Sequence, residues 1–169
     1  TDANKSSATG EQLANEAYTA FKKYREVDPA MPLISDDSYQ NGPVNIYSAF
    51  YTRGYADYGT KSWQAGFEKF KVAVDMSDLL ISKKIVTITM DTNLMILAGL
   101  MAENSKNLED AAKYYTRFAD AKIPGDDYEA IYRFLVNYHF THKDIANFEK
   151  YKAIGQELYP KSEYFSYDK

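Results

Sequence analysis

Few residues in this chain have the types and spacing needed for metal chemistry. His139 and His142 are three residues apart, so a helix would present both on one face, as a pair of metal ligands requires. The only further ligand type nearby is Asp144, and a metal site needs a complete set of ligands. We therefore interpret the histidines as solvated residues at a helix end, and expect no metal and no other cofactor.

Two pairs of adjacent carboxylates, Asp36-Asp37 and Asp126-Asp127, are the candidates for acid–base catalysis. Glycosidases and aspartic proteases place two carboxylates with separated pKa values in a cleft. Adjacent acids before a helix more often cap its first turn and complement its dipole. The sequence also has no cysteine, no glycine-rich phosphate loop and no nucleophile-elbow serine motif. We therefore expect that the protein is not an enzyme.

Composition and charge narrow the classes of partner. The 24 acidic and 20 basic residues are interspersed and give a net charge of −4, and no basic block could neutralise nucleic-acid phosphates. No run approaches 18 apolar residues, so no membrane span is predicted. The 16 tyrosines are the unusual feature, because tyrosine combines a large contact area with a hydroxyl and serves both cores and recognition surfaces.

Apolar residues at three- and four-residue spacings predict seven helices and no strand. The ends are set by Pro, Gly, Asp and Ser, and the expected helices cover residues 11–27, 43–58, 62–82, 93–103, 108–121, 128–140 and 143–158. Asp91 or Thr92 is expected to cap the fourth of these helices, and Asp126 or Asp127 the sixth. The β-branched segment 83–90 has no partner strand, so we expect an extended loop there. Residues 1–10 are polar and predict a disordered lead-in. Residues 163–169 form a tail that either begins one more helical turn or frays.

A pattern of small and bulky residues repeats along the chain. A shift of 45 residues pairs Gly54 with Gly99, Trp63 with Leu108, Gly66 with Ala111, and Phe70 with Tyr115. A shift of 36 residues pairs Tyr115 with Tyr151, Ala119 with Gly155, and Pro124 with Pro160. Two helices approach closely only where a side chain is nearly absent, and bulky side chains then fill the grooves between them. We expect such contacts at Gly54, Gly66, Gly99, Ala111 and Ala112.

This pattern resembles the tetratricopeptide repeat, a unit of two antiparallel helices. One unit fits Phe50, Gly54, Gly66, Phe70 and Ala73; a second fits Met95, Gly99, Ala111, Tyr115 and Pro124; a third, in a register uncertain by one residue, fits Tyr132, Leu135, Tyr151, Gly155 and Pro160. The resemblance implies an all-α fold, a right-handed α-α superhelix of antiparallel helix pairs. It implies one helical-repeat domain over residues 11–162, with a half unit at 11–30 and units at 43–82, 91–125 and 127–162. The half unit is either an N-terminal cap or a sign that the chain is part of a longer array.

In the family, the first helices of successive units line a concave peptide-binding groove. Carried over to this chain, the groove positions are Tyr51, Tyr55, Tyr58, Ile96, Leu100, Arg133 and Asn137, together with Ser48, Asn93, Glu103 and Phe140. Tyr51 and Tyr55, like Ile96 and Leu100, occupy positions where one subtype uses Lys and Asn to clamp a C-terminal carboxylate, so that mode is disfavoured. The alternative to a binding role is that these tyrosines belong to the core and only pack against neighbouring helices.

The resemblance implies a non-catalytic scaffold that binds a protein or peptide. Two alternatives stay open: self-association, for example as a homodimer, and a carbohydrate-associated module whose tyrosines stack on sugars. The composition resembles that of exported repeat proteins of Gram-negative anaerobes, which favours a periplasmic location, although the absence of cysteine fits either cytoplasm or periplasm.

Overall fold

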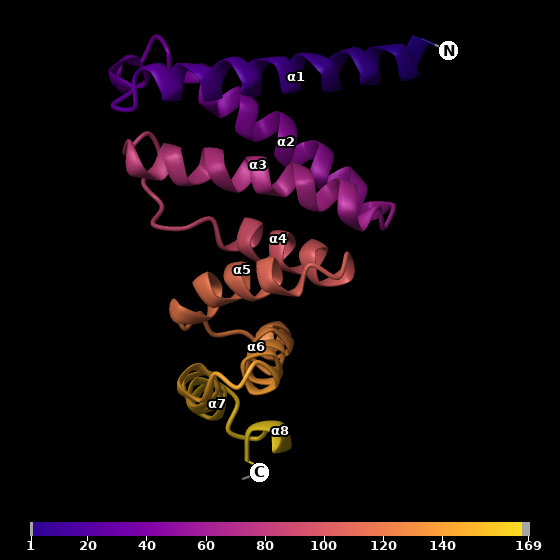
Figure 1. Cartoon of the computed structure of the whole chain (residues 1–169), viewed down its shortest axis with the longest axis vertical. Coiled ribbons are helices and arrows are strands. Elements are labelled where there is room, and N and C mark those ends of the chain that lie inside the picture. The colour runs from indigo at the N-terminus through magenta and orange to yellow at the C-terminus, as the bar shows by residue number, and fades with distance from the viewer. Residues whose placement is uncertain (1, 167–169) are drawn as a thin grey trace. The chain divides into compact units, whose positions relative to one another are not determined.

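A computed structural model describes the backbone of residues 2–166 and the side chains of residues 9–166, and every regular element in this part of the chain is helical (Figure 1). The elements are α1 (Asp2–Val27), η1 (Pro32–Ser35), α2 (Asn41–Gly59), α3 (Trp63–Ser82), α4 (Thr92–Asn104), α5 (Leu108–Asp120), η2 (Asp126–Tyr128), α6 (Glu129–Thr141), α7 (Ile145–Leu158) and α8 (Glu163–Ser166). The all-α prediction is confirmed, and segment 83–90 is a loop of turns, bends and irregular backbone that contains no strand.

The structure differs from the expected boundary at the N-terminal end. Helix α1 begins at Asp2, so residues 2–10 are helical where the sequence predicted a disordered lead-in. This stretch has no proline and joins an amphipathic helix directly, so the helix extends into it. The tail begins one more helical turn, α8, which is one of the two forms expected for it. Thr1 of the lead-in and residues 167–169 of the tail lie outside the described residues. The chain divides into two compact units, residues 1–94 and 95–169.

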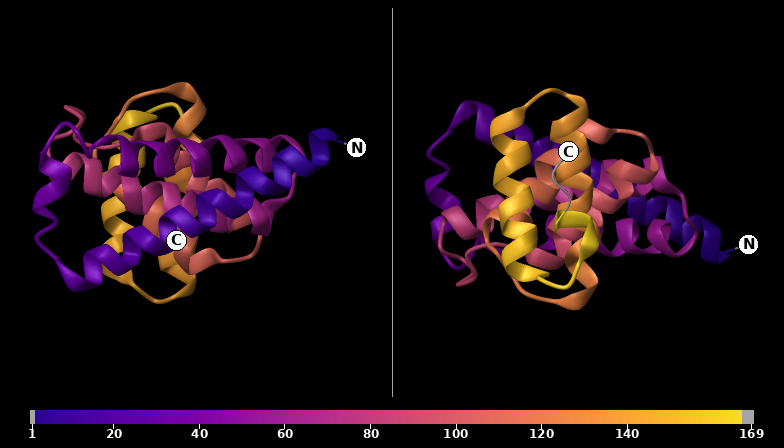
Figure 2. Two further views of the ribbon diagram at one scale, coloured as in Figure 1. Left: turned by 90° about the horizontal axis from the view of Figure 1, so that it is seen from above. Right: turned by 90° about the horizontal axis from the view of Figure 1, so that it is seen from below.

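The first unit is built on the pair α2 and α3. The two helices are antiparallel and joined by a short turn, and they bury Ile46, Phe50, Phe67 and Phe70. Helix α1 crosses this pair (Figure 2), with the Tyr18 ring 5.7 Å from that of Phe50. Arg25 forms an ion pair of 2.8 Å with Asp75 of α3. Apolar burial and this pair together hold α1 on the unit.

The second unit contains most of α4 together with α5, α6, α7 and α8. Helix α5 packs on α6 through two edge-to-face ring pairs, Tyr115 with Phe134 at 5.1 Å and Phe118 with Tyr128 at 4.9 Å. Helices α6 and α7 form a second antiparallel pair joined by a short turn. Phe165 of α8 is only 1% exposed, so its burial holds the end of the described chain against this unit.

A contact between a glycine and an aromatic ring recurs in two helix pairs. A Cβ atom on Gly54 of α2 would lie 3.1 Å from the Phe70 ring of α3, and one on Gly99 of α4 would lie 2.3 Å from Cε1 of Tyr115 of α5. The two contacts are related by the same shift of 45 residues that the sequence showed. The expected small residues at positions 54, 66, 99, 111 and 112 are all buried. In the pair α6 and α7, the position equivalent to Gly99 is the buried Leu135, so that pair is not built around a glycine.

A lysine with an unexpected backbone conformation follows five of the helices. Each of them follows a helix with the left-handed backbone conformation: Lys61, Lys84, Lys106, Lys122 and Lys143. After α4, the Lys106 amide donates to the Glu103 carbonyl at 3.0 Å and the next amide, of Asn107, donates to Ala102 at 2.9 Å. These two bonds form a Schellman motif, in which glycine usually takes the left-handed position. A lysine there places its charge near the negative end of the helix dipole.

The predicted helix caps are partly confirmed. Asp91 Oδ1 accepts a hydrogen bond of 3.1 Å from the Leu94 amide and caps α4. Asp126 and Asp127 instead lie within the short helix η2, and α6 begins without a side-chain cap, so the prediction of a cap there is wrong. In the sequence, Asp91 and the pair Asp126-Asp127 both lie just before a helix. The 3₁₀ turn η2 separates Asp126 and Asp127 from the first amides of α6, whereas no such turn separates Asp91 from α4.

Candidate functional site

The predicted groove residues fall on three helices. Tyr51, Tyr55 and Tyr58 lie on α2 in the first unit. Ile96 and Leu100 lie on α4, and Arg133 and Asn137 on α6, in the second unit. The structure brings the α2 set together in one surface and the α6 set together in another.

The surface on α2 is a continuous row of rings, which we call the tyrosine ladder: Tyr47, Tyr51, Tyr55, Tyr58 and Trp63. Neighbouring ring centroids are 5.7, 6.4, 5.9 and 6.4 Å apart along the row. The Tyr51 and Tyr55 planes are almost parallel, at 8°. Tyr47 and Trp63 were not among the predicted groove residues, although Tyr47 precedes Tyr51 by one helical turn.

The ladder is only partly buried. Tyr55 is 55% exposed, whereas Tyr51 is half-buried with its ring 6.0 Å from that of Phe70. The Tyr47 hydroxyl donates a hydrogen bond of 2.6 Å to Asp91. Burial, with Asp91 next, raises the pKa of both Tyr47 and Tyr51 above the ordinary tyrosine value. Both hydroxyls are thus protonated at neutral pH. Packing against neighbouring helices, the alternative to a binding role, describes the half-buried Tyr51 better than the exposed Tyr55.

The surface on α6 is a cavity of about 530 Å³ between α6, α7 and α8. Its apolar lining consists of Val136, Phe140, Phe148 and Tyr164. Its polar lining consists of Glu129, Arg133, Asn137, Lys152, Ser162 and Glu163. The α6 members recur at spacings of three and four residues, so they share one helix face. Two predicted groove residues, Arg133 and Asn137, thus lie in one cavity together with Phe140.

The two ends of this cavity differ in polarity. Near the turn between α6 and α7, the Phe140 and Phe148 rings lie 5.5 Å apart. Near α8, the Arg133 guanidinium lies over the Tyr164 ring at 4.7 Å, and the Tyr164 hydroxyl donates to the Arg133 carbonyl at 3.2 Å. Ser162 donates a hydrogen bond of 2.7 Å to Glu129 at the same end. The sequence could not indicate the α7 and α8 residues, because they come from outside the first-helix positions.

The two α4 residues are separate from this cavity. Ile96 and Leu100 are half-buried and do not line it. Glu103, one turn further on, accepts a hydrogen bond of 3.0 Å from the Tyr115 hydroxyl and so takes part in the packing of α4 on α5.

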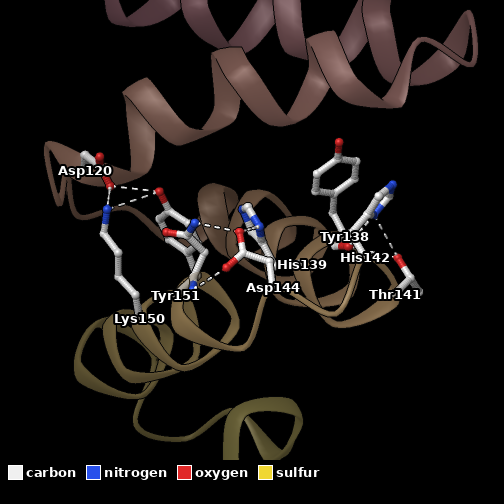
Figure 3. A network of polar contacts seen from close by, with 9 residues as sticks. Asp120, Tyr138, His139, Thr141, His142, Asp144, Lys150 and Tyr151 are labelled. Carbon is white, nitrogen blue, oxygen red and sulfur yellow. Dashed lines mark hydrogen bonds and ion pairs between the residues drawn. The ribbon is translucent and has the colours of Figure 1, made fainter.

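The histidines belong to a network of polar contacts across α5, α6 and α7 (Figure 3). His139 Nδ1 lies 3.0 Å from Asp144 Oδ2, and the His139 ring stacks on Tyr151 at 5.5 Å. The Tyr151 hydroxyl in turn donates to Asp120 of α5 at 3.0 Å. His142 is exposed as expected, but the side chain of His139 is only 12% exposed, so the prediction that it is solvated is wrong. The stacking on Tyr151 explains its burial.

Within the described residues, no cluster of three or more His, Cys, Asp or Glu side chains has the arrangement of a metal site. No helix in the described part of the chain combines the length and apolar character needed to cross a membrane. Comparisons of the chain with protein-family models, curated proteins and solved structures found no match.

Proposed function

We propose that this chain is a non-catalytic scaffold that binds a protein or peptide, built from tetratricopeptide-like helix pairs that stack as a right-handed superhelix. The observation that carries the proposal is the cavity on α6, where Arg133, Asn137 and Phe140 line one space of about 530 Å³. All three were chosen from the sequence as groove positions. Cavities of this size with an apolar wall and a few polar groups are typical of ligand sites.

The tyrosine ladder supports the same proposal in the first unit. Tyrosine and arginine are enriched among residues that dominate binding energy, because they bury a large area and still offer hydrogen bonds. Tyr55, which is 55% exposed, presents such an area without any rearrangement of the helix.

The proposal predicts that the double variant Tyr51→Ala plus Tyr55→Ala loses affinity for peptides that use the ladder by about 2 kcal/mol or more. Peptides would first be selected from a random 12-residue library displayed on phage, using the full chain as bait. Their affinities would then be measured by isothermal titration calorimetry, and helicity by circular dichroism. Tyr39→Ala is the matched control, since Tyr39 is 56% exposed but lies in the loop before α2.

If the full chain enriches no peptide from the library, the proposed function is wrong. Loss of helicity in the double variant would instead assign Tyr51 and Tyr55 to the core, in which case the ladder is not a binding surface. Equal weakening by Tyr39→Ala would also count against the ladder, because it would indicate a non-specific effect of removing exposed rings.

Self-association remains the second candidate, and one observation favours it. A groove of about 480 Å³ between α1 and α2 is lined by Leu13, Ala14, Ala17 and other residues, and Leu13 is 59% exposed. Sedimentation velocity at micromolar concentration would show a dimer without any ligand if this groove pairs with a second copy. The carbohydrate alternative is weaker, because Tyr51 is half-buried and its ring is parallel to that of Tyr55, which leaves a sugar fewer free ring faces.

A further inference from the structure

We propose that the cavity between α6, α7 and α8 binds a peptide segment in which one acidic residue is adjacent to a large apolar residue. The carboxylate binds the Arg133 guanidinium, and the apolar side chain lies against Phe140 and Phe148. This inference rests on the proposed peptide-binding function and specifies the chemistry of its ligand.

Arg133 is the reason for the acidic residue. It is exposed on α6, and its guanidinium is held over the Tyr164 ring at 4.7 Å. No carboxylate among the described residues forms an ion pair with it. A guanidinium that stacks on a ring keeps its N–H edge free, and that edge binds a carboxylate through two parallel hydrogen bonds. The charge at this end of the cavity is thus already oriented for an acidic ligand group.

The other end of the cavity explains the apolar residue. Phe140 is 47% exposed, and its ring lies 5.5 Å from that of Phe148 on α7. Together with Val136 these rings form an apolar wall facing the cavity. Burying an aromatic or large aliphatic side chain there removes apolar area from water on both partners. Arg133 and Phe140 are seven residues apart on one helix, about 10 Å along its axis. Adjacent side chains of an extended peptide point in opposite directions, so one can reach each end of the cavity when the peptide backbone lies between them.

Asn137 lies between these two ends, one turn from each. Its exposed side-chain amide lines the cavity and has no hydrogen-bond partner among the described residues. An amide offers both a donor and an acceptor, which suits the backbone of an extended peptide. Asn137 therefore fits a role in holding the peptide backbone between the carboxylate and the apolar side chain.

The carboxylates of the cavity limit the ligand to a single acid. Glu129 accepts the hydrogen bond from Ser162, and Glu163 lies in the first turn of α8. A run of acidic residues would bring a second carboxylate near these two groups and be repelled. The cavity therefore distinguishes one acid beside an apolar residue from a polyacidic segment.

Fluorescence anisotropy with four labelled hexapeptides tests the inference on the full chain. The probes carry Phe-Glu, Phe-Gln, Ala-Glu or Glu-Glu at the centre of an otherwise identical Gly-Ser sequence. We expect the Phe-Glu probe to bind at least 10-fold more tightly than each of the others. In Arg133→Gln the preference of Phe-Glu over Phe-Gln disappears, and in Phe140→Ala the preference over Ala-Glu disappears. Lys113→Gln, which removes an exposed charge from α5 outside the cavity, leaves both preferences intact.

Equal binding of Phe-Glu and Phe-Gln, or a preference that survives in Arg133→Gln, would overturn the inference. The inference would also be wrong if the library peptides that bind the chain contain no acidic residue and bind Arg133→Gln with unchanged affinity. That result would leave the proposed peptide-binding function intact. A dimer in sedimentation velocity that Arg133→Gln dissociates would show that a second copy, not a peptide, occupies the cavity. Circular dichroism of each variant confirms that differences in binding do not come from unfolding.

Discussion

At the scale of single residues, the left-handed lysines set the turns of the second unit. Lys106 and Lys143 have φ of 68° and 59° and lie between the two helices of a pair. The left-handed conformation costs a residue with a Cβ about 1–2 kcal/mol, which glycine avoids. The lysine charge recovers part of this cost at the helix end. Hydrogen bonding and packing thus form these turns without the glycine that usually takes the left-handed position.

Lys106→Gly is therefore expected to raise the free energy of unfolding by about 0.5–1 kcal/mol, because the relief of backbone strain exceeds the loss of the charge. Chemical denaturation followed by circular dichroism measures this change. Lys113→Gly, in the middle of α5, is the matched control and is expected to lower the free energy of unfolding by about 1 kcal/mol. A loss of stability in Lys106→Gly similar to that of the control would contradict the left-handed assignment.

This scale also shows what the sequence could predict. Tyr51, Tyr55 and Tyr58 were placed on one face because helical periodicity alone determines that, and the ladder follows. The burial of His139 was missed, because it depends on Tyr151 from the next helix. Lysine at the left-handed positions could not be predicted either, since its own propensity argues against it.

At the scale of helices, the glycine–ring contacts determine how closely paired helices approach. In both α2 with α3 and α4 with α5, the glycine precedes the ring by 16 residues. Residue size in the sequence predicted these contacts, because a side chain at either glycine would crowd the ring. The cavity on α6 was predicted only in part: Arg133 and Asn137 follow from the repeat, but its α8 wall depends on Phe165 docking against Gly155, which no repeat position indicates.

Gly99→Ala is expected to lower the free energy of unfolding by about 1–3 kcal/mol. A Cβ atom there would lie 2.3 Å from the Tyr115 ring, which is buried and hydrogen-bonded to Glu103 and so has little freedom to move. Urea denaturation provides the measurement. Gly59→Ala is the control, because nothing lies within 4 Å of a Cβ atom at this exposed position of α2. The usual helix preference for alanine then makes Gly59→Ala neutral or slightly stabilising.

Equal effects of the two substitutions would show that the α4–α5 contact is looser than described. A Tyr115→Leu change combined with Gly99→Ala offers a second check. The smaller side chain removes the ring that the added methyl meets, so the double variant is expected to be more stable than the sum of the single changes predicts.

At the scale of the whole molecule, both units contain tyrosines whose hydroxyl groups contact carboxylates, a half-buried one in the first unit and a buried one in the second. Tyr18 donates to Asp75 at 3.0 Å, and burial followed by Asp75 raises the pKa of Tyr18 to about 12. In the second unit, burial and then Glu103 raise the pKa of Tyr115. Each such pair stabilises the fold only while the tyrosine keeps its proton. The high tyrosine content that first suggested a recognition surface therefore also makes the stability of both units sensitive to alkaline pH.

The free energy of unfolding is therefore expected to fall as pH rises above about 10. Tyrosines in the unfolded chain ionise near pH 10, whereas Tyr18 in the folded chain holds its proton to about pH 12. Between these values the unfolded state binds fewer protons than the folded state, so stability decreases with pH. Urea denaturation at pH 8 to 12, with tyrosinate absorbance recorded in parallel, measures this decrease. In Tyr18→Phe the decline should be shallower than in the wild type, and in the exposed-loop variant Tyr39→Phe it should be unchanged; a stability that stays constant from pH 8 to 11.5 would contradict the role of these buried hydroxyls.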